Sequence, residues 1–165
     1  MPAVPQRILP PPPPGFVCWE ELMAEALDEA RIAGTAGEVP VGALLVSGQG
    51  RILAKAGNAV ERLRDPTAHA EMRVLREASY RTGSSRLGDC VLVSTLEPCL
   101  MCAGALVLAR PAGIVYGAAD PEAGAVDSRL DVLDMPFLKC AIWRLGAVSE
   151  EECSALLKNF FRARR

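Results

Sequence analysis

Two short motifs carry residue types that could hold a metal ion and move protons. His69 and Glu71 stand two residues apart in the first motif, and Cys99 and Cys102 stand three apart in the second. One imidazole and two thiolates suit zinc, and three protein ligands leave a fourth tetrahedral position open for water. A nearby carboxylate can transfer the protons of that water. The motifs therefore predict a catalytic zinc site with Glu71 as the proton-transfer residue.

Both motifs fall at the start of predicted helices. Cys99 and Cys102 lie on one face of a helix that begins near Pro98, so both sulfurs can converge on one ion. The helix N-terminus also favours the thiolate form that a metal requires. His69 begins a different helix, which Thr67 can cap, so the imidazole can approach the ion from the opposite side.

A structural zinc site is the alternative. It would need a fourth protein ligand, which Cys90, Cys140 or Cys153 could supply. A C-x-x-C pair can also form redox thiols, and a lone histidine is often a core residue. The catalytic interpretation is favoured because the H-A-E and P-C-x-x-C motifs occur together, and because each begins a helix.

Length and composition fit a single folded domain. The chain has 165 residues, of which 50% are hydrophobic. The net charge of -2 argues against binding nucleic acid through bulk positive charge, although a local basic patch is compatible with it. No apolar run is long enough to span a membrane, and the N-terminus lacks a secretory pattern. We therefore expect free or metal-binding cysteines rather than disulfides, and a cytoplasmic protein.

The remaining chain alternates helices and strands. Helices are expected over about 18–33, 67–80, 98–109 and 150–164, and strands over 39–46, 52–56, 90–94, 113–117 and 139–144. Residues 120–132 are expected to form a loop and then a short helix. This alternation predicts one α/β sheet with helices packed on it. The proline-punctuated residues 1–15 predict a disordered tail, or a docking segment for a proline-binding module, before a domain over 16–165.

The two motifs and their surroundings resemble the zinc-dependent deaminase superfamily and, within it, the bacterial tRNA-specific adenosine deaminases. The resemblance covers nearly everything after the proline-rich tail. Its blocks are Glu38–Ala43, Asn58, Asp65–Glu71, Thr95–Ala105, Tyr116–Asp120, Asp131–Leu133 and Phe160–Arg165.

This resemblance implies a three-layer α/β/α, cytidine-deaminase-like fold with a central mixed five-stranded sheet, and a homodimer. It implies hydrolytic conversion of adenosine to inosine at the wobble position of a tRNA anticodon. It assigns His69, Cys99 and Cys102 to one Zn²⁺ per subunit, and Glu71 to the proton shuttle of a zinc-activated water.

The resemblance also implies substrate contacts. Asn58 would hydrogen-bond the base, which its adjacent donor and acceptor atoms permit, although a turn residue is the alternative. The backbone amide of Ala70 would contact the base, and Asp120 would lie beside the nucleotide. Phe161 and Arg162 would contribute from the C-terminal end.

Basic residues at Arg62 and Arg64, and near the C-terminus, could contact phosphates of an anticodon stem-loop or could simply be solvated helix ends. The sequence departs from the resembled pattern over 134–143, and at Ala119, where an arginine is common. Two other functions remain open. One is deamination of a free base or nucleotide such as guanine, cytidine or deoxycytidylate. The other is a non-catalytic RNA-binding subunit with structural zinc, which would have no need of Glu71.

Overall fold

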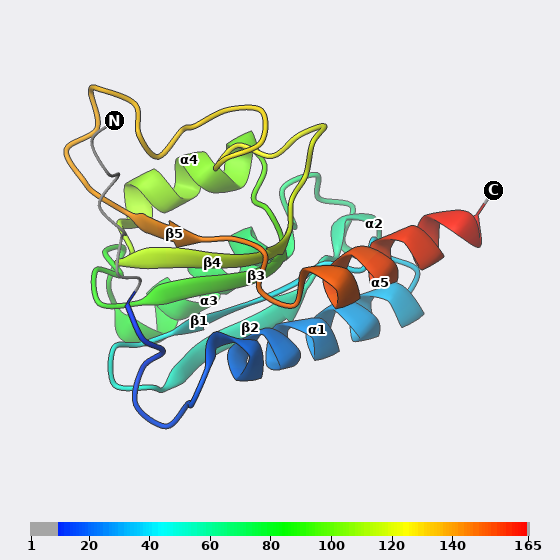
Figure 1. Ribbon diagram of the computed structural model, residues 1–165, viewed down its shortest axis with the longest axis horizontal. Coiled ribbons are helices and arrows are strands. Elements are labelled where there is room, and N and C mark those ends of the chain that lie inside the picture. The colour runs from blue at the N-terminus through cyan, green and yellow to red at the C-terminus, as the bar shows by residue number, and fades with distance from the viewer. Residues whose placement is uncertain (1–9, 165) are drawn as a thin grey trace, which may run out of the picture.

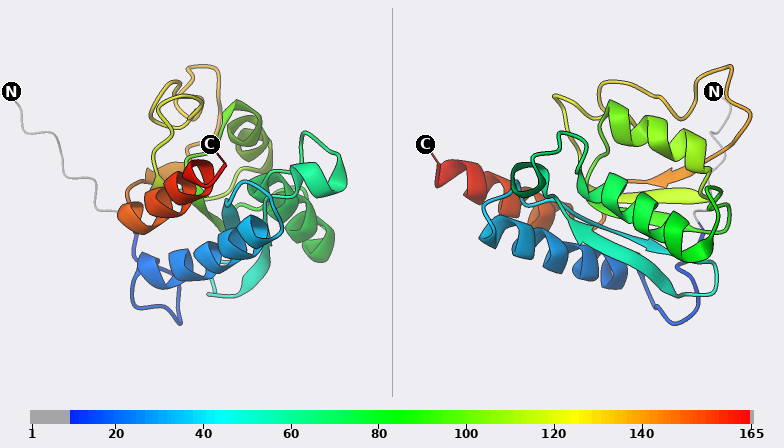
Figure 2. Two further views of the ribbon diagram at one scale, coloured as in Figure 1. Left: turned by 90° about the vertical axis from the view of Figure 1, so that its right-hand side faces the viewer. Right: turned by 180° about the vertical axis from the view of Figure 1, so that it is seen from behind.

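The computed structural model describes residues 10–164, which build a five-stranded sheet between two helical layers (Figures 1 and 2). The strands lie in the order β2-β1-β3-β4-β5. Strand β1 pairs antiparallel with β2 and β3, whereas β3, β4 and β5 are parallel to one another. The strand bounds are β1 Gly42–Val46, β2 Ile52–Gly57, β3 Val91–Leu96, β4 Gly113–Ala118 and β5 Trp143–Leu145.

Helices cover both faces of this sheet, which confirms the predicted α/β/α layering. The helix bounds are α1 Trp19–Thr35, α2 Val60–Leu63, α3 Ala70–Thr82, α4 Leu100–Ala109 and α5 Glu150–Arg162. Helices α1 and α5 pack on one face, and α3 and α4 on the other (Figure 2). The short helix α2 lies beyond the end of β2, near the start of α3 (Figure 1).

The central strands are buried on both sides, as covered sheets require. In β1, Ala43 and Leu45 belong to the core beneath α3 and α4, whereas Leu44 and Val46 belong to the core beneath α1 and α5. This alternation follows the period of two in a strand. Gly42 begins β1 where α1 crosses it, because a Cβ there would lie 2.0 Å from the carbonyl oxygen of Ala26.

Three local predictions were wrong. No helix forms within 120–132, which holds turns and an isolated bridge at Gly124. Thr67 does not cap α3; its backbone N–H and its hydroxyl both donate to Asp65 Oδ1, at 2.8 and 2.7 Å, and His69 occupies the N-cap position. Helix α2 was not predicted, and β5 is shorter than the expected strand over 139–144.

Part of the predicted proline-rich tail contacts the domain. The indole N–H of Trp19 donates to the carbonyl oxygen of Pro10 at 3.1 Å. The carbonyl of Pro14 approaches Gly50 so closely that a Cβ there would lie 1.8 Å from its oxygen. Residues 1–9 lie outside the described residues, so disorder there, and a domain that begins at residue 16, stay predictions.

Candidate active site

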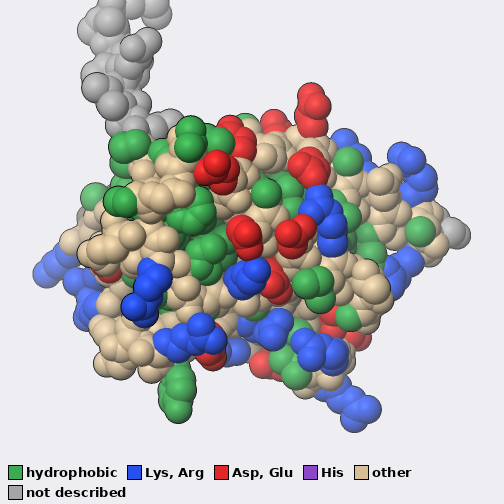
Figure 3. Space-filling model, turned by 90° about the horizontal axis from the view of Figure 1, so that it is seen from below, with side chains coloured by type: hydrophobic (Ala, Val, Ile, Leu, Met, Phe, Trp, Pro, Cys, Tyr) green, Lys and Arg blue, Asp and Glu red, His purple; other side chains and the backbone are tan. Residues whose placement is uncertain are grey.

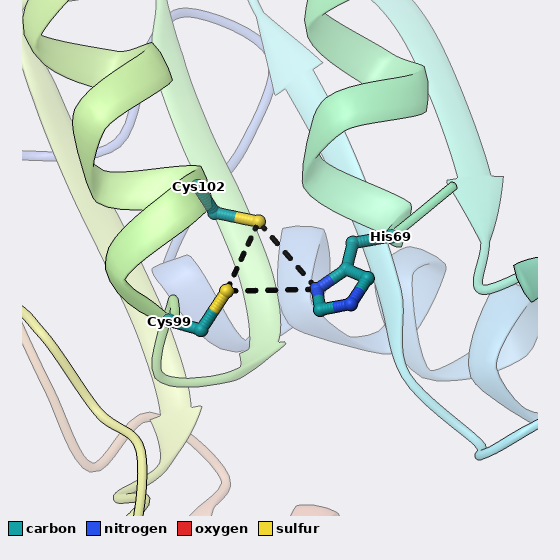
Figure 4. Close-up of side chains that lie close together, drawn as sticks. All are labelled: His69, Cys99 and Cys102. Carbon is teal, nitrogen blue, oxygen red and sulfur yellow. Dashed lines mark hydrogen bonds between the residues drawn. The ribbon is translucent and has the colours of Figure 1, made fainter. Parts of the chain in front are cut away.

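The three predicted metal ligands converge at the N-terminal ends of two helices. His69 stands at the N-cap of α3, Cys99 stands at the N-cap of α4, and Cys102 lies in the first turn of α4 (Figure 4). The Nδ1 atom of His69 is 3.6 Å from Cys99 Sγ and 3.7 Å from Cys102 Sγ, and the sulfurs are 3.8 Å apart.

This spacing fits a tetrahedral zinc ion. With Zn–S bonds of about 2.3 Å and Zn–N bonds of about 2.0 Å, tetrahedral angles require roughly 3.8 Å between sulfurs and roughly 3.5 Å between sulfur and nitrogen. The hydrogen bond between the two thiols lowers the pKa of Cys99 to about 3 and raises the pKa of Cys102. Two adjacent thiolates repel each other unless a cation lies between them, so the donor set itself calls for a metal.

A fourth protein ligand is not available within residues 10–164. The only group of converging His, Cys, Asp and Glu atoms found there is His69, Cys99 and Cys102. Cys90 contacts Asp89, and the Sγ of Cys140 points to the Val107 carbonyl at 4.0 Å. Cys153 packs beneath Gly117 in the core under α1 and α5. The donor set is that of an open site rather than a closed structural one.

Glu71 adds a buried carboxylate beside the metal ligands. It lies in the first turn of α3, is 3% exposed, and lines the same cavity as His69 and Cys99. Its Oε1 is 3.4 Å from the hydroxyl of Ser94. Burial raises the pKa of Glu71. A carboxylate with a raised pKa can accept a proton and release it again at neutral pH.

A cavity of about 330 Å³ opens onto this group. Asn58 and Asp120 line it, as predicted, and Val39, Val41 and Leu96 give it apolar walls. The Asn58 side chain makes no hydrogen bond to other described residues, whereas its backbone N–H donates to Val41 at 2.8 Å. A planar ring could therefore lie between apolar walls with its polar edge facing a free amide.

The other predicted substrate contacts are placed differently. Ala70 is fully buried and does not line the cavity. Phe161 and Arg162 lie exposed near the end of α5, outside the cavity lining. Asp120 Oδ1 accepts hydrogen bonds from the backbone N–H groups of Glu122 and Ala123, each at 3.0 Å, so one of its oxygens already holds a turn.

Sequence reasoning missed a buried carboxylate on one side of the cavity. Glu38 is 2% exposed and accepts hydrogen bonds from the backbone N–H groups of Glu61 at 3.1 Å and Arg62 at 2.7 Å. These are free N–H groups of the first turn of α2, whose own N-cap residue, Ala59, has no side-chain acceptor. Glu38 therefore caps α2 from 23 residues away.

A second buried carboxylate holds another part of the cavity wall. Glu97 is 1% exposed and accepts hydrogen bonds from the loop over residues 120–128. Burial opposes ionisation, but these bonds outweigh it and lower the pKa of Glu97. Little in the sequence indicated these roles. Glu38 and Glu97 stand inside longer motifs, and the backbone groups that they bind are distant in sequence.

Residues 18–118 match the family described as cytidine and deoxycytidylate deaminase zinc-binding region. The chain belongs to this deaminase family. Relatives named tRNA-specific adenosine deaminase extend the match over most of the chain. The protein from Aquifex aeolicus (strain VF5) is 45% identical over 147 residues, covering 88% of this chain and 95% of its own. The Bacillus subtilis (strain 168) protein is 43% identical over 146 residues, covering 88% and 90%.

Solved structures of the same deaminase family share the fold. A structure from a study of A-to-I editing by tRNA:A34 deaminases superposes with a TM-score of 0.80 at 43% identity, covering 83% of this chain and 99% of the other. A guanine deaminase from Nitrosomonas europaea superposes with a TM-score of 0.72 at 25% identity, covering 86% and 83%. The predicted mixed-sheet fold is therefore confirmed.

Proposed function

We propose that this protein is a zinc-dependent hydrolase that converts adenosine to inosine at the wobble position of a tRNA anticodon. The observation that carries the proposal is an open His-Cys-Cys site with a buried glutamate, in a chain 43–45% identical to tRNA-specific adenosine deaminases over 88% of its length. We assign His69, Cys99 and Cys102 to one Zn²⁺ per subunit. All six cysteines are free, which fits a cytoplasmic enzyme.

Zinc held by the three assigned ligands would supply an acidified water to this cavity. Glu71 would accept a proton from water and donate it to the departing amine, so that adenosine and water give inosine and ammonia. Asn58 orients the base through its free amide, and the apolar walls exclude bulk water from the reacting edge. We propose that Asp120 contacts the nucleotide through its remaining oxygen, and that the Ala70 amide contributes at the base.

RNA contacts outside the cavity come from scattered basic groups rather than from overall charge. In Figure 3 basic side chains are spread over both ends and the lower edge of the face, and acidic side chains lie in its middle and along its upper edge. Arg164 donates to the carbonyl of Gly37 at 3.1 Å, which brings the end of α5 beside the cavity residue Glu38. We propose that Phe161, Arg162 and the exposed Arg62 and Arg64 contact the anticodon loop around the bound base.

A substrate panel tests this function against its rivals. Purified protein would be incubated with an anticodon stem-loop that carries a wobble adenosine, the same stem-loop with that adenosine moved by one position, and free adenosine, guanine and cytidine. We expect inosine only in the first RNA. Turnover of guanine or cytidine alone would assign a free-base or nucleoside deaminase instead. No turnover by the zinc-loaded protein would favour a non-catalytic RNA-binding subunit.

We further propose a homodimer that pairs the outer face of α4. Leu100 is 57% exposed and Leu108 is 75% exposed, and Gly104 lies between them on the same side of the helix. A Cβ at Gly104 would meet nothing within 4 Å, although glycine weakens a helix interior by about 1 kcal/mol relative to alanine. An apolar helix face with a central glycine suits close approach by the same helix of a second copy.

Replacing Leu108 with Glu should convert this dimer to a monomer. A charge buried at the centre of an apolar interface has no partner, so association should weaken by more than about a hundredfold. Light scattering should give twice 17.6 kDa for the wild type and 17.6 kDa for the variant. Leu63→Glu, at a 52% exposed leucine in α2, is the control and should stay dimeric. A monomeric wild type would refute the dimer.

A further inference from the structure

We propose that Glu97 is a positioning residue for the reaction, which holds the 120–124 wall of the cavity against the metal site. This inference rests on the proposed function. It adds that part of the substrate affinity depends on Glu97, a side chain that does not touch the reacting atoms. Glu97 reaches the edge of the cavity, but its carboxylate oxygens are occupied by the loop.

The two carboxylate oxygens of Glu97 accept hydrogen bonds from different parts of the loop. Oε1 accepts three consecutive backbone N–H groups, from Val126 at 3.1 Å, Asp127 at 2.8 Å and Ser128 at 2.9 Å. Oε2 accepts the backbone N–H of Asp120 at 3.0 Å and the hydroxyl of Ser128. No cation contacts this carboxylate among the described residues, so its charge is balanced by loop donors alone.

The loop is thereby tied to the segment that carries a metal ligand. Gly124 forms an isolated antiparallel bridge with Cys99, and the N–H of Ala125 donates to the carbonyl of Pro98 at 2.9 Å. A Cβ at Gly124 would lie 2.4 Å from the carboxyl carbon of Glu97, so the loop passes directly over this carboxylate. Asp120 and Ala123, which line the cavity, are carried by the same turn.

The far end of the loop has separate anchors. The Tyr116 hydroxyl donates to Asp127 Oδ2 at 2.5 Å, and Arg144 forms an ion pair with Asp127 Oδ1 at 2.8 Å. Neither Tyr116 nor Asp127 lines the cavity. Loss of the Tyr116 bond should therefore loosen the loop without moving the wall, whereas loss of the Asp120 bond should move the wall itself.

Glu97→Gln separates these contacts with little change in shape. The amide oxygen can replace Oε1 and keep the three N–H donors, and the Ser128 hydroxyl can turn to accept from the new NH₂ group. The Asp120 N–H then faces a donor and loses its acceptor. With the anticodon stem-loop as substrate, we expect KM to rise about tenfold for this lost buried bond. We expect kcat within about a factor of two of wild type, and unchanged zinc content.

Tyr116→Phe is the matched control, since it removes a hydrogen bond from the same loop. It should lower Tm by a similar amount and leave KM unchanged. Hydrogen exchange should be faster at Asp120 in Glu97→Gln, but not in Tyr116→Phe. Gly124→Ala should reproduce the KM rise by pushing on Glu97 and on the backbone carbonyl of Asp120, whereas Gly88→Ala, whose Cβ would meet only the Arg110 carbonyl at 3.8 Å, should not.

Three outcomes overturn the inference in distinguishable ways. An active wild type with an unchanged KM in Glu97→Gln would show that the wall does not depend on this carboxylate. Equal KM rises in Glu97→Gln and Tyr116→Phe would show that Glu97 stabilises the loop in general and has no specific effect on the cavity wall. A zinc-loaded wild type that leaves the wobble adenosine unchanged would refute the proposed function, and this inference with it.

Discussion

Glu71→Gln should lower kcat on the anticodon stem-loop by about a thousandfold or more, within the range that a lost general acid–base group produces. The substitution keeps the size of the side chain and removes its ability to accept a proton. Glu71 is almost fully buried beside His69 and Cys99. A carboxylate on the protein surface cannot reach this position, so it cannot take over the proton transfer. Zinc content should remain at the wild-type value, because the three ligands are untouched.

The same substitution on the exposed side of α3 provides the control. Glu77 forms an ion pair with Arg81 at 2.6 Å and is 49% exposed, so Glu77→Gln should leave kcat and zinc unchanged. Single-turnover rates and elemental analysis would be measured for both variants. A Glu71→Gln enzyme with wild-type kcat would rule out the proton-transfer role.

Cys102→Ser should weaken metal binding by more than about a hundredfold and abolish activity with it, since even outer-shell changes cost about ten- to a hundredfold in affinity. Cys102 is fully buried, and its sulfur lies 3.7 Å from His69 Nδ1 and 3.8 Å from Cys99 Sγ. A neutral hydroxyl at this position is a poor zinc ligand. Because metal binding also stabilises a folded site, Tm should fall toward that of the chelator-treated wild type.

Cys140→Ser provides the comparison for this variant. Its sulfur points to the Val107 carbonyl at 4.0 Å, and it lies outside the metal group. Zinc content, measured after dialysis against a weak chelator, should equal that of wild type. Loss of zinc from Cys140→Ser would indicate a fourth protein ligand, and would support a structural site in place of the open one.

The metal site could be predicted from the sequence because its geometry is local. Cys99 and Cys102 are three residues apart at a helix start, and His69 begins a second helix, so each helix determines where its ligands point. The same holds for strands β1 and β2 and for helix α5, which form within or close to their expected ranges. Strong local periodicity also gave the α/β layering.

The cavity walls could not be predicted because distant carboxylates hold them. Helix α2 has alanine at its N-cap and is capped by the distant Glu38 instead, and the 120–128 loop is held by Glu97 rather than by a helix of its own. Asp120 does cap a turn, but no helix follows. Secondary-structure propensity depends on neighbouring residues, so it cannot predict hydrogen bonds between residues far apart in the sequence.

The predicted substrate contacts fall into two groups, those that line the cavity and those that lie outside it. The resemblance implied that Asn58 and Asp120 lie at the site. Both line the cavity, and each follows a strand, β2 or β4. Phe161 and Arg162 sit on a helix that packs on the opposite face from α3, and their position relative to the cavity depends on how far α5 extends past the sheet (Figure 1). Their contacts with RNA remain a proposal.

The most direct test is isotopic. The wild-type protein would be incubated with an anticodon stem-loop in ¹⁸O-labelled water, and the RNA digested to nucleosides for mass spectrometry. The account predicts inosine at the wobble position with one ¹⁸O atom at C6, one ammonia released per inosine formed, and no change at other adenosines. Unaltered wobble adenosine, or inosine without the label, would contradict hydrolytic deamination of RNA by this site.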